Sequence, residues 1–218
     1  MIKYETDPLK IKKKSFKAIR EQVSLDHLNQ DEQLIAIQMI QASGDLSILE
    51  NLRFSNSVVE KALQTLEDDY EMLCDTDAVV CSLKQKYLKD EPICLINKAN
   101  VISQAKSNKT TRSMTAVDLW KPYIDHSIIL IGSEPTALFR LLELLKDEKK
   151  KPALVIATPV GFTGAIESKQ LLWDMQKELD IPCITLLGSR GSSTLTTTAM
   201  NTILQINRAK KELEKAKD

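Results

Sequence analysis

The sequence predicts an α/β fold: a doubly wound, mainly parallel sheet with helices on both faces and a helical N-terminal segment. Two observations carry this prediction. In the second half of the chain, short apolar runs alternate with amphipathic segments, and this order is typical of doubly wound sheets. The runs IILI and LVIA are continuously apolar, as expected for parallel strands that helices cover on both faces.

Each expected element follows from its own pattern. Short apolar runs with β-branched residues, bounded by polar or turn residues, predict five strands. They span Met72–Cys74, 93–96, 127–131, 153–157 and 183–187. Apolar residues at helical spacing between the later strands predict helices over 137–145 and 167–179.

The N-terminal third has helical patterns only. Pro8 suits the first turn of a helix whose apolar residues fall on one side. A second helix is expected to end near Gly44, because glycine readily adopts the left-handed conformation of a C-terminal cap. A third is expected over 57–66, with Asn56 as its N-cap. The Lys/Glu-rich tail 208–218 is expected to be a fraying helix end.

No internal repeat or low-complexity linker divides the sequence, which predicts one domain over residues 1–218. Composition argues against several classes of protein. The chain has 30 basic and 30 acidic residues, so no net charge attracts nucleic acid. Only 5% of its residues are aromatic, which leaves few side chains on which bases could stack. No apolar run approaches the ~20 residues of a membrane span. The basic N-terminus lacks the apolar run of a signal peptide. A cytoplasmic protein without nucleic-acid or membrane partners is expected.

Cysteine and histidine are too few and too scattered for a metal site. The chain has four cysteines and two histidines, with no C-x-x-C pair and no H-E-x-x-H motif, so no protein-bound metal is expected. Three cysteines stand in apolar stretches, which predicts buried, reduced thiols. These three are Cys81, Cys94 and Cys183.

Three loops that follow predicted strands have an unusual composition. Residues 132–136, 158–164 and 188–194 are rich in glycine, proline, serine and threonine. In an open α/β sheet, ligands bind beyond the carboxyl ends of the strands, against helix N-termini. Free backbone N–H groups there, assisted by Arg190 and Lys169, would suit an anion. In the alternative interpretation, glycine and proline only shape tight turns, and Lys169 pairs with the nearby glutamate at position 167.

A further candidate anion site is the run 110–113, Thr-Thr-Arg-Ser. Arginine can bind a carboxylate with two parallel hydrogen bonds, while hydroxyls add directional contacts. An N-capped helix beside a surface arginine would explain the same tetrapeptide. Nucleotide-binding glycine fingerprints and the G-x-S-x-G nucleophile motif are absent from the sequence.

Taken together, these segments resemble the precorrin-8X methylmutases, called cobalt-precorrin-8 methylmutases in the anaerobic pathway. The resemblance runs from about residue 4 to residue 204. Five motifs of the family have counterparts in this sequence. They are its N-terminal pattern, T-R-S, P-T-A-L-F, P-V-G-F-x-x-A-x-E-S-K and the final G-x-x-G-x-S. These stand at Pro8, Ile11, Ser15 and Phe16, at 111–113, at 135–139, at 159–169, and at Gly188, Gly191 and Ser193.

The resemblance implies an α/β homodimer with a corrinoid site near the subunit interface. The family's reaction moves a methyl group from C11 to C12 of the macrocycle by a protonation-assisted shift, and it needs no separate cofactor. Because the substrate carries several carboxylates, the resemblance also implies a substrate-binding set. The set comprises Ser15, Gln38, Thr111, Arg112, Ser113, Thr136, Lys169, Gly188, Arg190 and Ser193.

The sequence departs from the family where the proton is handled. The family carries R-x-I-H at the end of its second helix, with the histidine as proton donor or acceptor. This chain has Gln38 and Gln41 at those two positions, so Gln41 occupies the catalytic position. Glu134 also adds a negative charge beside the expected polyanion site. Two functions remain open: a methylmutase, or a relative that binds a tetrapyrrole or another polycarboxylate without isomerising it.

Overall fold

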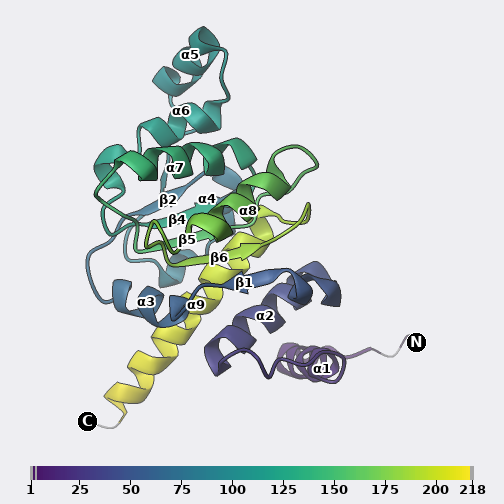
Figure 1. The fold of residues 1–218 in the computed structure, drawn as a ribbon. Coiled ribbons are helices and arrows are strands. Elements are labelled where there is room, and N and C mark those ends of the chain that lie inside the picture. The colour runs from purple at the N-terminus through teal and green to yellow at the C-terminus, as the bar shows by residue number, and fades with distance from the viewer. Residues whose placement is uncertain (1, 3, 217–218) are drawn as a thin grey trace.

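The computed structural model describes residue 2 and residues 4–216 as a six-stranded sheet between two layers of helices (Figure 1). The strand order is β1-β6-β5-β4-β2-β3, with every pair parallel except β1 and β6. The strands are β1 (Leu52–Phe54), β2 (Met72–Cys74), β3 (Ile93–Cys94), β4 (Ile128–Ile131), β5 (Leu154–Ala157) and β6 (Cys183–Leu186). The predicted doubly wound, mainly parallel sheet is confirmed.

Nine α-helices surround the sheet in the described part of the chain. They are α1 (Pro8–Arg20), α2 (Gln30–Ser43), α3 (Val58–Thr65), α4 (Asp77–Ser82), α5 (Ala99–Asn108), α6 (Arg112–Asp118), α7 (Pro135–Asp147), α8 (Ala165–Met175) and α9 (Ser193–Lys215). In Figure 1, α7 and α8 lie above the sheet, and α2, α3 and α9 lie below it. Short 3-10 helices follow α2 (Leu46–Glu50), α4 (Gln85–Tyr87) and α6 (Lys121–Tyr123).

Each central strand contributes side chains to two separate cores. In β4, Ile128 and Leu130 pack with residues of α2, α3 and α9, while Ile129 and Ile131 pack with residues of α7 and α8. All four side chains are fully buried. A strand with apolar neighbours on both faces needs an unbroken apolar run, which explains IILI.

Most expected elements are confirmed, and the differences lie at short strands and caps. Residues 93–96 form only a two-residue strand. Sequence reasoning missed β1, whose three residues Leu-Arg-Phe carry no pattern. Ser57, in a left-handed conformation, precedes α3, so the predicted N-cap Asn56 is wrong. Gly44 caps α2 at φ 68°, as predicted. The tail is an ordered helix to residue 215, and residues 217–218 lie outside the described residues.

The four cysteines are free thiols, and two of them are buried. Cys74 and Cys183 are buried, Cys94 is half-buried and Cys81 is exposed. Cys81 stands near the end of the short helix α4, on the side that faces solvent, so its apolar neighbours along the sequence do not surround it. The prediction of a buried thiol is therefore wrong for Cys81.

Candidate functional site

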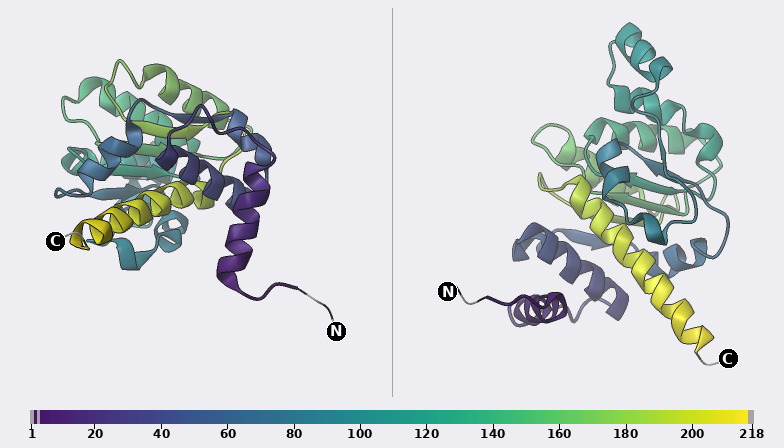
Figure 2. Two further views of the ribbon diagram at one scale, coloured as in Figure 1. Left: turned by 90° about the horizontal axis from the view of Figure 1, so that it is seen from below. Right: turned by 180° about the vertical axis from the view of Figure 1, so that it is seen from behind.

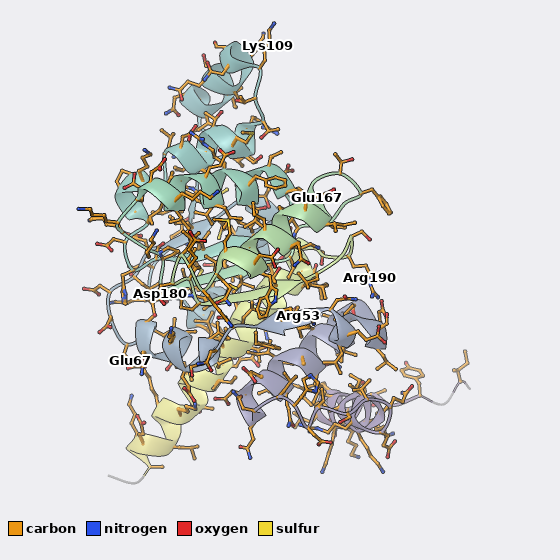
Figure 3. The ribbon with its side chains drawn as sticks, in the orientation of Figure 1. Arg53, Glu67, Lys109, Glu167, Asp180 and Arg190 are labelled. Atoms are coloured by element: carbon orange, nitrogen blue, oxygen red, sulfur yellow. The ribbon has the colours of Figure 1, made fainter. Side chains whose placement is uncertain are left out.

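The carboxyl ends of the parallel strands gather the three unusual loops along one edge of the sheet. The β5–α8 and β6–α9 loops project on the same side of the molecule as the end of α2 (Figures 1 and 2). Figure 3 shows Glu167, in the first turn of α8, and Arg190, in the β6–α9 loop, on that side. This edge is the candidate site, as the strand-end argument predicts.

Asp75 organises the loop that follows β4. It lies directly after β2, is 1% exposed, and accepts three backbone hydrogen bonds on Oδ2. The donors are the N–H groups of Gly132 (3.2 Å), Ser133 (2.8 Å) and Glu134 (3.0 Å). Burial raises the pKa of Asp75, although the three amide donors oppose that change. The expectation of free N–H groups in this loop is therefore wrong, because Asp75 already uses them.

Three hydroxyls from separate motifs meet at the start of α6 and α7. Thr111 Oγ1, Ser113 Oγ and Thr136 Oγ1 are each 3.0 Å from the other two. Thr111 also caps α6 by accepting the N–H of Met114 at 3.2 Å. Ser113 is buried, whereas Thr111 is exposed. The structure thus brings together the T-R-S and P-T-A-L-F motifs, and the hydroxyl triad of Thr111, Ser113 and Thr136 can turn hydrogens toward an incoming anion.

Arg112 places a cation beside the hydroxyl triad. Its Nη1 donates to Asn97 Oδ1 at 2.9 Å, and Asn97 in turn donates to the Asp77 carboxylate. The Arg112 side chain is exposed. One nitrogen is therefore held by a neutral amide, which leaves the charge of the guanidinium for an external carboxylate.

A second group of hydroxyls joins the ends of β4 and β6. Ser133 Oγ lies 2.6 Å from Ser193 Oγ and 3.4 Å from Thr76 Oγ1. The chain comes very close at Gly191, where an added Cβ would lie 2.1 Å from the carbonyl oxygen of Thr158. Only glycine fits there, so the β5–α8 and β6–α9 loops are packed directly against each other.

Lys169 supports the β6–α9 loop from beneath. Its side chain is fully buried, and its Nζ donates to the carbonyl oxygen of Arg190 at 2.6 Å. Burial lowers the pKa of Lys169 to about 8. The alternative of a helix-start pair with Glu167 is not observed in the structure, since Glu167 points to solvent and Lys169 points to the loop.

Arg190 links this loop to the end of α2. Its Nη1 pairs with the Asp45 carboxylate and donates to Ser47 Oγ at 2.6 Å. Hydrogen bonds from Ser47, followed by the Arg190 guanidinium, lower the pKa of Asp45. Arg190, the predicted cation of the site, therefore lies at the candidate edge, with an acidic partner from this chain.

Gln38 and Gln41 lie on the last turns of α2, next to that ion pair. A spacing of three residues puts them on one side of the helix. Gln41 is exposed and Gln38 is half-buried. Asp45, four residues beyond Gln41, contacts Arg190, so the two glutamines belong to the same edge as the β6–α9 loop.

Ser15 is separated from the hydroxyl triad. It stands on α1, which packs against α2, and α1 lies at the opposite end of the molecule from α5 and α6 (Figures 1 and 2). Within one chain, the structure therefore does not bring Ser15 next to Thr111.

A large groove lies beside the candidate edge and shares Ser47 with it. It has a volume of about 1010 Å³, runs beside β1 and is lined by apolar and acidic side chains that include Leu49, Phe54 and Glu60. None of the predicted site residues lines it. Residues 2 and 4–216 contain neither a helix that could cross a membrane nor a cluster of three metal-ligating side chains.

Sequence reasoning missed the residues that hold the site in shape. Asp75 and Asp45 each fix one loop, and Asn97 holds Arg112. Among these three residues, Asp75 alone had a signal in the sequence, because it is an aspartate directly after the buried strand β2. Asp45 and Asn97 act across long sequence separations, which no local pattern reports.

Comparisons with known proteins show which family this chain is similar to. The family model described as "Precorrin-8X methylmutase" matches residues 10–206. A precorrin-8X methylmutase from Pseudomonas aeruginosa is 34% identical over 205 residues, covering 93% of this chain and 98% of the relative. A cobalt-precorrin-8 methylmutase from Methanocaldococcus jannaschii is 28% identical, covering 91% and 93%.

A solved structure has the same fold. The precorrin-8X methylmutase structure from Thermus thermophilus superposes with a TM-score of 0.81 at 28% identity, covering 92% of this chain and 97% of that one. The family match extends through α2, both hydroxyl groups and the β6–α9 loop. The chain belongs to the precorrin-8X methylmutase family.

Proposed function

We propose that this chain is a methylmutase of cobalamin biosynthesis that moves a methyl group from C11 to C12 of precorrin-8X or its cobalt counterpart. The observation that carries the proposal is the family match over residues 10–206, which includes the whole candidate edge. The reaction is an isomerisation, so the proton that assists it is returned and no co-reactant is consumed. The chain works in the cytoplasm as one domain without a separate cofactor.

The substrate's peripheral carboxylates would be held at the edge of the sheet. The hydroxyl triad donates to one carboxylate, and Arg112 supplies a charge beside it. Gly188 and Ser193 add a backbone donor and a hydroxyl donor. Arg190 offers a second cation when it exchanges Asp45 for a substrate carboxylate, while Lys169 holds the Arg190 peptide in place.

We further propose a homodimer that brings Ser15 to the corrinoid. Within one chain, α1 contacts α2 and lies far from the triad (Figure 1). Leu9 is 79% exposed and Ile11 is 43% exposed on α1, and an apolar surface of this kind favours a protein partner. A second copy that covers α1 would place Ser15 near the neighbouring site.

Gln41 sets the rate of the proposed reaction. Its amide can donate a hydrogen bond to the ring but does not exchange a proton near neutral pH. A positioned acid–base group contributes roughly 10²–10⁴-fold, so slow turnover with a solvent-derived proton is expected. Gln38 also lacks the charge of the family's arginine, which would contribute about 1.5–3 kcal/mol to binding.

A second function also follows from the presence of Gln41. With Gln41 exposed at the catalytic position, the chain could hold a tetrapyrrole or another polycarboxylate without isomerising it. Turnover of precorrin-8X by Gln41→His and by the Gln38→Arg, Gln41→His double variant, compared with the unaltered chain, separates the two functions. A slow methylmutase shows measurable turnover that rises roughly 10²-fold or more in the variants.

Three other outcomes are informative. Tight binding with no turnover, followed by activity in the variants, identifies a non-catalytic corrinoid binder. Turnover that equals that of the histidine variants shows that this chain uses another proton donor. Absence of both binding and rescue contradicts a corrinoid function altogether.

A further inference from the structure

The β5–α8 loop presents an apolar surface at the candidate site. Phe162 is 94% exposed, Val160 is 49% exposed, and Ile166, in the first turn of α8, is 44% exposed. Fully burying one such side chain stabilises a protein by about 1.5–3 kcal/mol relative to leaving it in water. Two of them on the loop and a third on the helical turn that follows it form an exposed patch of the kind that marks a binding surface.

The base of this loop is fixed, so the patch has a defined place. The N–H of Gly161 donates to the carbonyl oxygen of Ser189 at 3.0 Å, and Gly191 packs against the Thr158 carbonyl. The loop therefore stands beside the β6–α9 loop that carries Arg190. Figure 3 shows Arg190, in the β6–α9 loop, and Glu167, just after the β5–α8 loop, on one side of the molecule.

The rest of the edge is polar. The hydroxyl triad, the Ser133–Ser193 pair and the Arg190–Asp45 pair offer hydrogen bonds and charge. Among the described residues, the other large exposed apolar side chains stand on α1 or before it, on α5, on the 3-10 helix after α6, and near the end of α9. Val160, Phe162 and Ile166 therefore supply the exposed apolar surface at the part of the candidate edge formed by the β5–α8 loop and the start of α8.

We propose that Phe162, flanked by Val160 and Ile166, packs against the flat face of the corrinoid ring and acts as a specificity-determining residue. This inference rests on the proposed function. A tetrapyrrole of this class has a carboxylate-bearing rim and broad apolar faces, so a site needs both polar and apolar contacts. The polar edge matches the rim, and an aromatic ring at the loop tip matches the face.

The test uses hydrogenobyrinic acid, the metal-free product, as the binding probe for the full-length protein. Phe162→Ala is expected to weaken its binding tenfold or more, whereas Phe162→Trp keeps affinity within about threefold. Leu213→Ala, which removes an exposed apolar side chain near the end of α9, is the matched control and should leave affinity unchanged. Because Phe162 is exposed, its replacement leaves the core intact.

A labelling experiment locates the contact independently of affinity. Phe162→Cys is made in a Cys81→Ser background, since Cys81 is the exposed native thiol. Saturating hydrogenobyrinic acid is expected to slow alkylation of the introduced thiol at least tenfold. A Leu213→Cys variant in the same background should react at the same rate with and without the probe.

Each contrary outcome has a distinct meaning. If the unaltered chain binds the probe and Phe162→Ala binds it equally tightly, the contact is overturned and the proposed function stands. If the introduced thiol is already protected without the probe, in a manner that increases with protein concentration, the patch is a subunit contact and the inference is wrong. If the unaltered chain binds no hydrogenobyrinic acid, the inference and the proposed function both fail.

Discussion

At the scale of single residues, charged side chains at the candidate edge have two different roles. Arg112 is exposed and held by a neutral amide, so its charge is available to a ligand. Lys169 is fully buried and donates to a backbone carbonyl, so it shapes a loop. The sequence motif alone places both in the binding set, and burial is what distinguishes them.

Arg112→Ala is expected to weaken corrinoid binding by at least ~1.5 kcal/mol, the lower range for a hydrogen bond to a charged group. Isothermal titration with hydrogenobyrinic acid measures the change. Arg208→Ala is the control, because Arg208 pairs with Glu212 on the exposed end of α9. Equal affinities of the unaltered and Arg112→Ala proteins would remove Arg112 from the site.

Lys169 should make stability depend on pH in the alkaline range. Its pKa is about 8 in the folded chain against 10.5 when unfolded, so the unfolded state binds the extra proton between these values. The free energy of unfolding of the unaltered chain should therefore rise, relative to Lys169→Met, as pH increases from 8 toward 10.5. Below about pH 7, where Lys169 is protonated in both states, the difference should be constant.

Urea unfolding of both proteins at pH 7, 8, 9 and 10 measures this difference. The control is Lys177→Met, which removes an exposed lysine and should give a difference that does not vary with pH. Parallel profiles for the unaltered chain and Lys169→Met would show that Lys169 keeps its proton throughout, contrary to the account.

At the scale of elements, the β4–α7 loop depends on one buried carboxylate. Asp75→Ala leaves the N–H groups of Gly132, Ser133 and Glu134 without their acceptor. An unsatisfied buried donor costs about 1–3 kcal/mol, so the free energy of unfolding should fall by about 3 kcal/mol or more. Asp75→Asn, which keeps an oxygen acceptor, should lose less.

Urea unfolding also measures the Asp75 variants. Asp174→Ala is a suitable control, because Asp174 is exposed and accepts only from Gln170 on its own helix. A loss for Asp75→Ala no larger than that of the control would mean that the loop keeps its shape without Asp75.

The elements that sequence predicts best are those with strong local patterns. The buried runs of β4 and β5 and the capped end of α2 follow from periodicity and glycine chemistry. β1 has three residues and owes its existence to pairing with β6, far along the chain. The motifs predict which loops form the site, but the partners of Arg190 and Lys169 depend on tertiary contacts that no local pattern reports.

At the scale of the whole molecule, one chain leaves α1 with little cover. The helix packs on α2 and exposes Leu9 and Ile11. Sedimentation velocity should give a homodimer of two 24.5 kDa chains. A Leu9→Glu, Ile11→Glu double variant should raise the dimer dissociation constant about tenfold or more, because it places charge in an apolar contact.

Leu213→Glu changes an exposed leucine near the end of α9 and should not affect the dimer. A monomeric unaltered chain at micromolar concentration would contradict the dimer. A dimer that the α1 variant leaves intact would place the interface on another surface.

On the proposed function, this edge of the sheet binds precorrin-8X and isomerises it without the family's histidine. Turnover of precorrin-8X by the purified, unaltered chain, followed by the change in its visible spectrum, tests that claim most directly. Slow but measurable conversion is expected, roughly 10²–10⁴-fold below that of the Gln41→His variant. No conversion by the unaltered chain, with conversion restored by Gln41→His, would contradict catalysis and leave a corrinoid-binding protein.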